Sequence, residues 1–390
     1  MSNTSVAEGV RVIDTDTHVC EPADLWTSRL PARWHDVVPQ AVPHPDTGWR
    51  TWRIGDVWLR EEAWFAQAGW GRFPPEYPRH LDDDGVDPGA SQPAARIRRM
   101  DEYGVHAQIL YPNVIGFYAP LIMRMEPPVA LACVQTYNDY LVEFASYAPD
   151  RLIPIAMLPF WDVDAAVVEM RRAYEQGHRG ILFANKYEKV GLPPCWEPHW
   201  DPVYAAAQEL DLSVNFHVAV GENDGGVVAD RRSRPFNPSD STRMTTGLML
   251  GNAEPIAAIL TSGLCDRFPD LNFVSVESGF GYLPYLLESL DWHWIGQGGR
   301  GSLELLPSEY FRRQCYGTFW FETKTLPLLE QLADNVMFET DYPHPTSLCP
   351  GPVSPALPAA QHIAKYFVDL PADVVRKVLH DNAARLYHLA

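Results

Sequence analysis

The chain has 390 residues, of which 46% are hydrophobic and 12% aromatic. No charge-rich or low-complexity tract interrupts it, so the composition is typical of a globular protein with a large core. The net charge of −19 argues against nucleic-acid binding, which needs a basic face. An anionic substrate stays compatible with this charge, because a bound divalent metal can dominate its local field.

The sequence carries no pattern that would direct the chain to a membrane. Its opening residues, MSNTSVAEGV, lack the basic start and apolar stretch of a signal peptide. No apolar run reaches the ~20 residues that a membrane-spanning helix needs. The six cysteines are scattered and form no CxxC pair, which is typical of reduced thiols. We therefore expect a cytoplasmic protein with no membrane partner.

Short apolar runs alternate with amphipathic helical patterns, as in repeated β-α units around a parallel sheet. The predicted strands are 10–14, 107–111, 152–158, 180–184, 212–217, 272–277, 318–321 and 335–340. Helical patterns fall at 94–102, 131–148, 164–175, 200–210, 254–261 and 328–333. This order predicts a (β/α)8 TIM barrel, with residues 1–390 as one domain.

Two connections are too long for simple barrel loops. Residues 25–93 follow the first strand and contain seven tryptophans, at positions 26, 34, 49, 52, 58, 64 and 70. This insertion is either a peripheral subdomain with its own aromatic core or a cap that supplies an apolar wall to the pocket. Residues 218–251 follow the fifth strand and are expected to form a lid loop. Its Arg231, Arg232 and Arg234 either clamp a carboxylate or phosphate or lie on a solvated face.

Four predicted strands end in a His, Asp or Glu side chain. Asp16 and His18 follow the first strand, and residues two apart on a strand face the same side. The run LSVNFH ends in His217, LNFVSVE ends in Glu277, and Asp341 follows NVMFET. Each of these side chains alone is compatible with an ordinary structural role. Together they lie where the carboxyl ends of barrel strands converge on one mouth.

Carboxylates and imidazoles gathered at a barrel mouth would be poorly solvated without a cation. The donor set contains oxygen and nitrogen but no sulfur, which suits zinc, manganese or iron. The sequence therefore predicts a divalent metal site, with one ion or two, acting on a small-molecule substrate.

The ordered motifs resemble the amidohydrolase superfamily, in the branch of aminocarboxymuconate-semialdehyde and resorcylate-type decarboxylases. The similar segments cover nearly the whole chain: VIDTDTHVCEPADLW, RIRRMDEYGVHAQILYPN, VNFH, VSVESGFGYLPYLLE, FETDYPHP and DNAARLY. The resemblance implies a metal-dependent TIM-barrel enzyme that hydrolyses or decarboxylates a small organic acid, amide or lactone. It also implies a homodimer.

Carried over to this sequence, the resemblance implies metal ligation by Asp16, His18, His217 and Asp341. Asp341 would also handle a proton on the metal-bound water or on the substrate. Glu21 and His344 match family positions that orient the ligands.

Two positions depart from the family pattern. The first motif is D-x-H where many relatives have H-x-H or E-x-H, and a carboxylate there still suits a metal. Glu277 stands where many decarboxylases have a catalytic histidine, so it is either a proton donor or a ligand of a second ion. Lys186 lies near the position of a carboxylated lysine in dinuclear relatives, but its context, ANKYEK, is typical of an exposed loop.

Two other functions stay open at this stage. With Glu277 as a ligand, the site has three carboxylates and at least two histidines, a mixture that suits a non-haem diiron monooxygenase acting on a bulky apolar, terpenoid-like substrate. The third interpretation is a catalytically inactive barrel that serves as a scaffold. The intact series of ligands argues against the scaffold.

Overall fold

The computed structural model describes residues 9–71, 77–220 and 237–389. Eight parallel strands in two sheets give the arrangement of a (β/α)8 barrel. One sheet has the order β1-β5-β6 and the other the order β11-β10-β9-β8-β7. Single parallel bridges join the two sheets, at Thr17–Tyr342 on one side and Ala156–Ile181 on the other. The predicted architecture is confirmed, and these bridges connect its two sheets.

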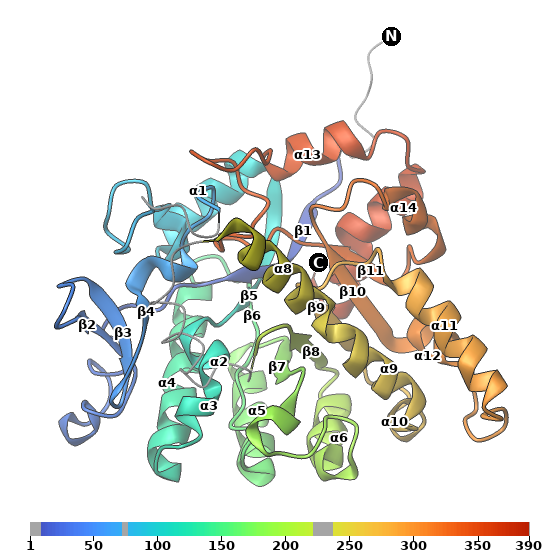
Figure 1. Cartoon of the computed structure of the whole chain (residues 1–390), viewed down its shortest axis with the longest axis horizontal. Helices are drawn as coiled ribbons and strands as arrows, with labels where there is room; N and C mark the ends of the chain where they lie inside the picture. The colour runs from blue at the N-terminus through green and yellow to red at the C-terminus, as the bar shows by residue number, and fades with distance from the viewer. Residues whose placement is uncertain (1–8, 72–76, 221–236, 390) are drawn as a thin grey trace.

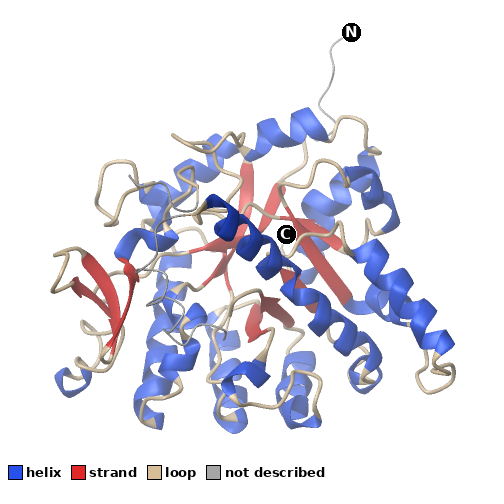
Figure 2. Ribbon diagram, in the orientation of Figure 1, coloured by secondary structure: helices blue, strands red, loops and turns tan. Residues whose placement is uncertain are grey.

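The barrel strands are short and buried. They are β1 Val12–His18, β5 Val105–Tyr111, β6 Leu152–Pro154, β7 Gly180–Ala184, β8 Ser213–His217, β9 Phe273–Val276, β10 Cys315–Phe319 and β11 Val336–Phe338. Helices surround the strands in the ribbon view (Figure 2), as expected for a barrel whose strands bury both faces.

The helices follow the strands in the usual alternation. They are α1 Pro93–Tyr103, α2 Val114–Phe117, α3 Ala119–Ile122, α4 Pro127–Ala145, α5 Val163–Gln176, α6 Asp201–Glu209, α8 Pro238–Met249, α9 Ala253–Thr261, α10 Leu264–Arg267, α11 Leu283–Gly296, α12 Pro307–Gln314, α13 Ala359–Tyr366, α14 Ala372–Arg376 and α15 Asn382–Leu386. None of the described helices is both long enough and apolar enough to cross a membrane.

Several predicted boundaries were wrong; the third predicted strand, 152–158, for example, ends at Pro154. The first strand begins at Val12 and continues to His18, so its polar residues belong to the strand itself. The seventh barrel strand begins at Cys315 rather than at 318, because Gly317 weakens the sequence pattern there. That glycine is needed for packing, since a Cβ on it would lie 2.8 Å from Cδ1 of Leu283. The helical pattern at 328–333 is a 3-10 helix, Leu326–Gln331.

The insertion 25–93 contains a separate antiparallel sheet, β2 Gln40–Pro43, β3 Arg50–Ile54 and β4 Val57–Glu61, at the left of Figure 1. Two of its tryptophans, Trp26 and Trp52, are buried in the main hydrophobic core, and their rings meet edge to face at 6.1 Å. The aromatic residues of the insertion therefore do not form an isolated core.

The predicted lid loop was wrong over its second half. Helix α8 occupies 238–249, and it crosses in front of the strands in Figure 1. Asn237 caps this helix by accepting a hydrogen bond from the backbone N–H of Ser239. Arg231, Arg232, Arg234 and the GENDGG motif lie outside the described residues.

Candidate metal centre at the barrel mouth

Asp16, His18 and His217 meet inside the barrel, and none of them is exposed to solvent. Asp16 and His18 lie on the same face of β1, and His217 is the last residue of β8. The two Nε2 atoms are 3.1 Å apart. Oδ1 of Asp16 lies 3.4 Å from Nε2 of His18 and 3.6 Å from Nε2 of His217.

The tautomers of both imidazoles follow from their outer partners. Nδ1 of His18 lies 2.9 Å from the carbonyl oxygen of Pro112, and Nδ1 of His217 lies 2.7 Å from that of Val218. A carbonyl oxygen can only accept, so each Nδ1 carries the hydrogen. In the neutral rings, both Nε2 lone pairs then face each other and the Asp16 carboxylate. Such an arrangement needs a cation between the lone pairs, and carbonyl groups behind metal-binding histidines are a common way to orient them.

The electrostatics of the cluster agree with this requirement. Burial alone would lower the pKa of His217, but the charge of Asp16 raises it to about 9. Burial and the charge of His344 lower the pKa of His18 to about 3. Without a metal ion, a proton on His217 would therefore balance the charge of Asp16, whose two oxygens accept no hydrogen bond from a described residue. A divalent ion fits the same donor set, because it would replace that proton and supply the positive charge that the three converging donors need.

Asp341 and His344 form a second pair next to the first cluster. Oδ1 of Asp341 is 2.7 Å from Nδ1 of His344 and 4.0 Å from Nε2 of His18. The rings of His18 and His344 stack with their centroids 3.9 Å apart. Asp341 has a φ of 57°, a left-handed conformation that is uncommon for a residue other than glycine. This strained turn directs the carboxylate back toward the mouth.

The contacts of His344 make this pair a candidate site for a proton. Asn113 donates its Nδ2 to the carbonyl oxygen of Val19, so its Oδ1 is free to accept from Nε2 of His344 at 2.7 Å. Nε2 therefore carries a hydrogen, and Nδ1 faces Oδ1 of Asp341 at 2.7 Å. A proton shared between Asp341 and His344 would make this contact favourable within the barrel mouth.

Glu21 supports this pair through the backbone. Its Oε1 accepts hydrogen bonds from the backbone N–H groups of Asn113 and Val114, at 3.1 and 2.8 Å. Burial raises the pKa of Glu21 to about 7. Through these bonds Glu21 positions Asn113, and Asn113 in turn contacts His344. Glu21 is therefore one residue removed from the side chains of the cluster.

Glu277 lies on the far side of His217. Its Oε2 is 3.8 Å from Nδ1 of His217, the nitrogen that points away from Asp16. Among the described residues, three groups could share one ion, and none of them includes Glu277: Asp16, His18 and His217; His18, Asp341 and His344; and His80, Asp82 and Asp83. Its φ of 54° is left-handed, like that of Asp341. Its role as a ligand or proton donor stays a prediction.

Sequence reasoning missed Glu339. It is fully buried after β11, and burial together with the charge of Asp16 raises its pKa well above the ordinary value. Its Oε2 is 3.4 Å from the backbone nitrogen of Glu277. The signal was present, because Glu339 ends the apolar run NVMF as Glu277 ends FVSV. Lys186, in contrast, lies outside the cluster, with Nζ 3.9 Å from Oε2 of Glu254.

Aromatic rings form one wall of the mouth. Phe117 stacks on His18 with centroids 5.6 Å apart, and Phe65 stacks on Phe117 at 5.3 Å. Phe65 also lies 5.6 Å from the ring of His344. Because Phe65 belongs to the insertion, residues 25–93 do supply an apolar surface beside the candidate centre.

A cavity of about 420 Å³ lies beside the loop that follows β11. One wall of this cavity is a face of α8, formed by residues at helical spacing: Pro238, Ser241, Thr242, Thr245, Thr246 and Met249. Phe321, Pro345 and Thr346 line the barrel side. Thr346 also donates its hydroxyl to Oδ2 of Asp341, which connects this cavity to the Asp341–His344 pair.

Comparison with known proteins identifies the family. A family model described as amidohydrolase matches residues 13–389, so the chain belongs to the amidohydrolase family. It is an enzyme, of a superfamily whose members depend on metal.

Curated relatives and solved structures lie in the same branch. The chain is 27% identical over 259 residues to gamma-resorcylate decarboxylase of a Rhizobium species, covering 64% of this chain and 76% of the relative. It is 25% identical over 279 residues to 2-amino-3-carboxymuconate-6-semialdehyde decarboxylase of Dictyostelium discoideum, covering 68% and 71%. The fold matches an amidohydrolase of Mycobacterium avium subsp. paratuberculosis with a TM-score of 0.72 and 22% identity, over 97% and 99% of the two chains.

We predict that His217→Ala removes bound metal while leaving the fold intact, because the site loses one of three converging donors and no bulky core side chain. Elemental analysis of the purified variant should find only a trace of divalent metal, and its circular dichroism should match the wild type. His178→Ala is the matched control, since His178 is a buried histidine outside the cluster. Equal metal in the wild type and in His217→Ala would show that the cluster is not the binding site.

Proposed function

We propose that the protein is a metal-dependent, non-oxidative decarboxylase of an aromatic carboxylic acid. The observation that carries the proposal is the 2.7 Å contact of Asp341 with His344 beside the Asp16–His18–His217 cluster, where this pair would hold a proton. Decarboxylation needs such a proton, because a C–H bond must replace the C–C bond that breaks. The family relatives with named activities, gamma-resorcylate and aminocarboxymuconate-semialdehyde decarboxylases, support the same chemistry.

Asp16, His18 and His217 would hold the metal, with Asp341 as a further ligand. A structural relative, 5-carboxyvanillate decarboxylase of Novosphingobium aromaticivorans, has bound manganese, at 18% identity and a TM-score of 0.65 over 98% of both chains. Manganese is therefore our first choice, and zinc and iron are the alternatives. When bound, the metal would orient the oxygen atoms of the substrate and neutralise their charge.

The residues of this chain would then carry the proton balance. The aromatic ring would lie against Phe117 and Phe65, with its carboxylate carbon toward the mouth. The proton held by Asp341 and His344 moves to the ring carbon that bears the carboxylate. The electron pair of the carbon–carbon bond then returns to the ring, and CO2 leaves. The site excludes water from this proton transfer because Asp341 is buried.

The cavity beside α8 supports a ring with polar substituents. Its helix face offers the hydroxyl groups of Ser241, Thr242, Thr245 and Thr246, and its apolar part comes from Met249 and Phe321. Hydroxyl or methoxyl groups on the ring would meet this mixed surface.

The relatives also favour non-oxidative chemistry over a diiron monooxygenase. Glu277 approaches the outer nitrogen of His217, which does not favour a second ion next to the first. The homodimer and the cytoplasmic location stay predictions.

The proton-transfer role predicts the behaviour of Asp341→Asn. With manganese and 2,6-dihydroxybenzoate or 5-carboxyvanillate in D2O, the wild type should release CO2 and place deuterium on the vacated ring carbon. The variant should be slower by about 10²–10⁴-fold, because general acid–base groups usually contribute that much. Asp240→Asn, on the exposed part of α8, is the control. An unchanged rate in Asp341→Asn would refute the role.

Glu277→Gln separates a ligand from a proton-handling residue. The contact to Nδ1 of His217 predicts that one equivalent of metal stays bound, while turnover falls. Loss of a metal equivalent would instead mean that Glu277 is a ligand. Elemental analysis and turnover measured on the same sample decide between these roles, with the exposed Glu288→Gln as the control. No change in either quantity would leave Glu277 with a structural role only.

The cavity predicts an effect on substrate binding. Thr242→Val removes a hydroxyl without changing shape, so KM should rise by about three- to tenfold, the value of one hydrogen bond, with kcat little changed. Arg243→Ala is the control on the same helix, since Arg243 pairs with Asp240 and does not line the cavity. A kcat that falls while KM stays constant would argue against a binding role for α8.

A further inference from the structure

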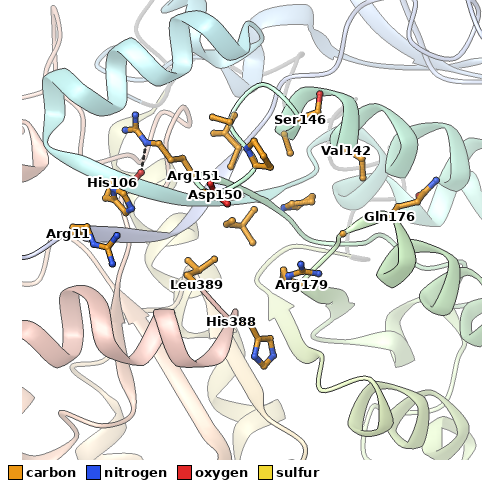
Figure 3. A pocket seen from close by; sticks show the side chains of 17 residues that line it. Arg11, His106, Val142, Ser146, Asp150, Arg151, Gln176, Arg179, His388 and Leu389 are labelled. Carbon is orange, nitrogen blue, oxygen red and sulfur yellow. Dashed lines mark hydrogen bonds between the residues drawn. The ribbon is translucent and has the colours of Figure 1, made fainter.

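A second cavity, of about 760 Å³, lies at the end of the barrel strands opposite to the candidate metal centre (Figure 3). Two of its lining residues directly precede strands: Arg11 comes before β1 and Arg179 before β7. The candidate metal ligands lie toward the other ends of the strands. This cavity is therefore separate from the site described above, and nothing in the proposed reaction uses it.

The lining of this cavity is rich in cations. Arg11, Arg151 and Arg179 line it, and Asp150 is the acidic residue among the lining side chains. Figure 3 shows that the arginines come from different segments around it. The local charge is opposite in sign to the net charge of −19 of the whole chain. Burial and the nearby charges of Arg11 and Arg151 lower the pKa of His106, which also lines the cavity.

Arg151 and Arg179 differ in whether an acidic side chain balances their charge. Arg151 donates to Asp101 at 2.8 Å and to the carbonyl oxygen of His106 at 2.7 Å, so its charge has a partner. Arg179 is partly buried, and its guanidinium forms no ion pair within the described parts of the chain. A cavity wall that carries a cation without a counter-charge suits a bound anion.

The helix ends beside the cavity would explain the position of these arginines without a bound ligand. The carboxyl ends of α4 and α5 reach the cavity through Ala145 and Gln176, and they carry partial negative charge. This effect stabilises a cation at the last turn of a helix. It does not account for a cavity large enough for an organic molecule, with Val142, Ala145 and Leu152 as an apolar part of its lining.

We propose that this cavity binds a small organic anion, with Arg11 and Arg179 contacting its phosphate or carboxylate groups and the apolar lining contacting its carbon skeleton. Arginine suits both groups, because its planar guanidinium donates two parallel hydrogen bonds to either. The proposal does not depend on the proposed decarboxylation.

The experiment is titration calorimetry with two probes, phenyl phosphate and benzene-1,3-dicarboxylate, at fixed ionic strength. The protein is compared with the double variant Arg11→Gln/Arg179→Gln. Arg171→Gln is the control, because Arg171 lies on the outside of α5 and pairs with Glu209. All measurements are repeated in the His217→Ala background, which removes binding at the candidate metal centre. Arg179→Lys keeps the charge if the Gln variant does not fold.

We expect at least one probe to bind in the His217→Ala background, and its affinity to fall by about tenfold or more in the double variant, as for charge-assisted hydrogen bonds. Arg171→Gln should bind normally. The probe that binds more tightly identifies phosphate or carboxylate as the preferred group. No binding of either probe, or equal affinity in the double variant, would overturn the proposal and leave the arginines as partners of the helix ends. None of these outcomes depends on enzymatic activity.

Discussion

Asp16 is a carboxylate in the interior of the barrel whose oxygens accept no hydrogen bond from a described residue, and two imidazole nitrogens converge on it. The outer nitrogens of His18 and His217 donate to backbone carbonyl groups, so the inner ones present lone pairs when the rings are neutral. Three donors facing one another need a positive charge among them. The arrangement of the mouth, its stacked rings and its second pair of side chains all depend on this requirement.

The surrounding structure maintains the arrangement through backbone contacts. Asp341 donates its backbone N–H to the carbonyl oxygen of Asp16 at 3.0 Å, and this bond lies at the seam between the two sheets. The seam between the two sheets therefore carries the Asp341–His344 pair. Left-handed backbone at Asp341 and Glu277 costs roughly 1–3 kcal/mol each, and such strain is often found at functional sites. Glu21 contributes by holding the turn that carries Asn113.

The fold could be predicted from the sequence because buried parallel strands are continuous apolar runs, and a polar residue that ends such a run is conspicuous. His217 and Asp341 were found in this way. Phe65 could not be placed, because its contact with Phe117 joins an insertion to the barrel across a long stretch of chain. Helix α8 was hidden by a polar sequence that buries no residue. Asn113 acts through hydrogen bonds that depend on the turn geometry, which the sequence pattern does not encode.

The central claim is that one divalent ion binds between Asp16, His18 and His217. Its most direct test is an anomalous difference map from a crystal of the manganese-loaded protein, recorded on both sides of the manganese absorption edge. Our account predicts a peak at about 2.0–2.3 Å from Nε2 of His18 and Nε2 of His217, the usual range for first-row metals. A peak elsewhere in the chain, or none in a protein that binds manganese in solution, would contradict it.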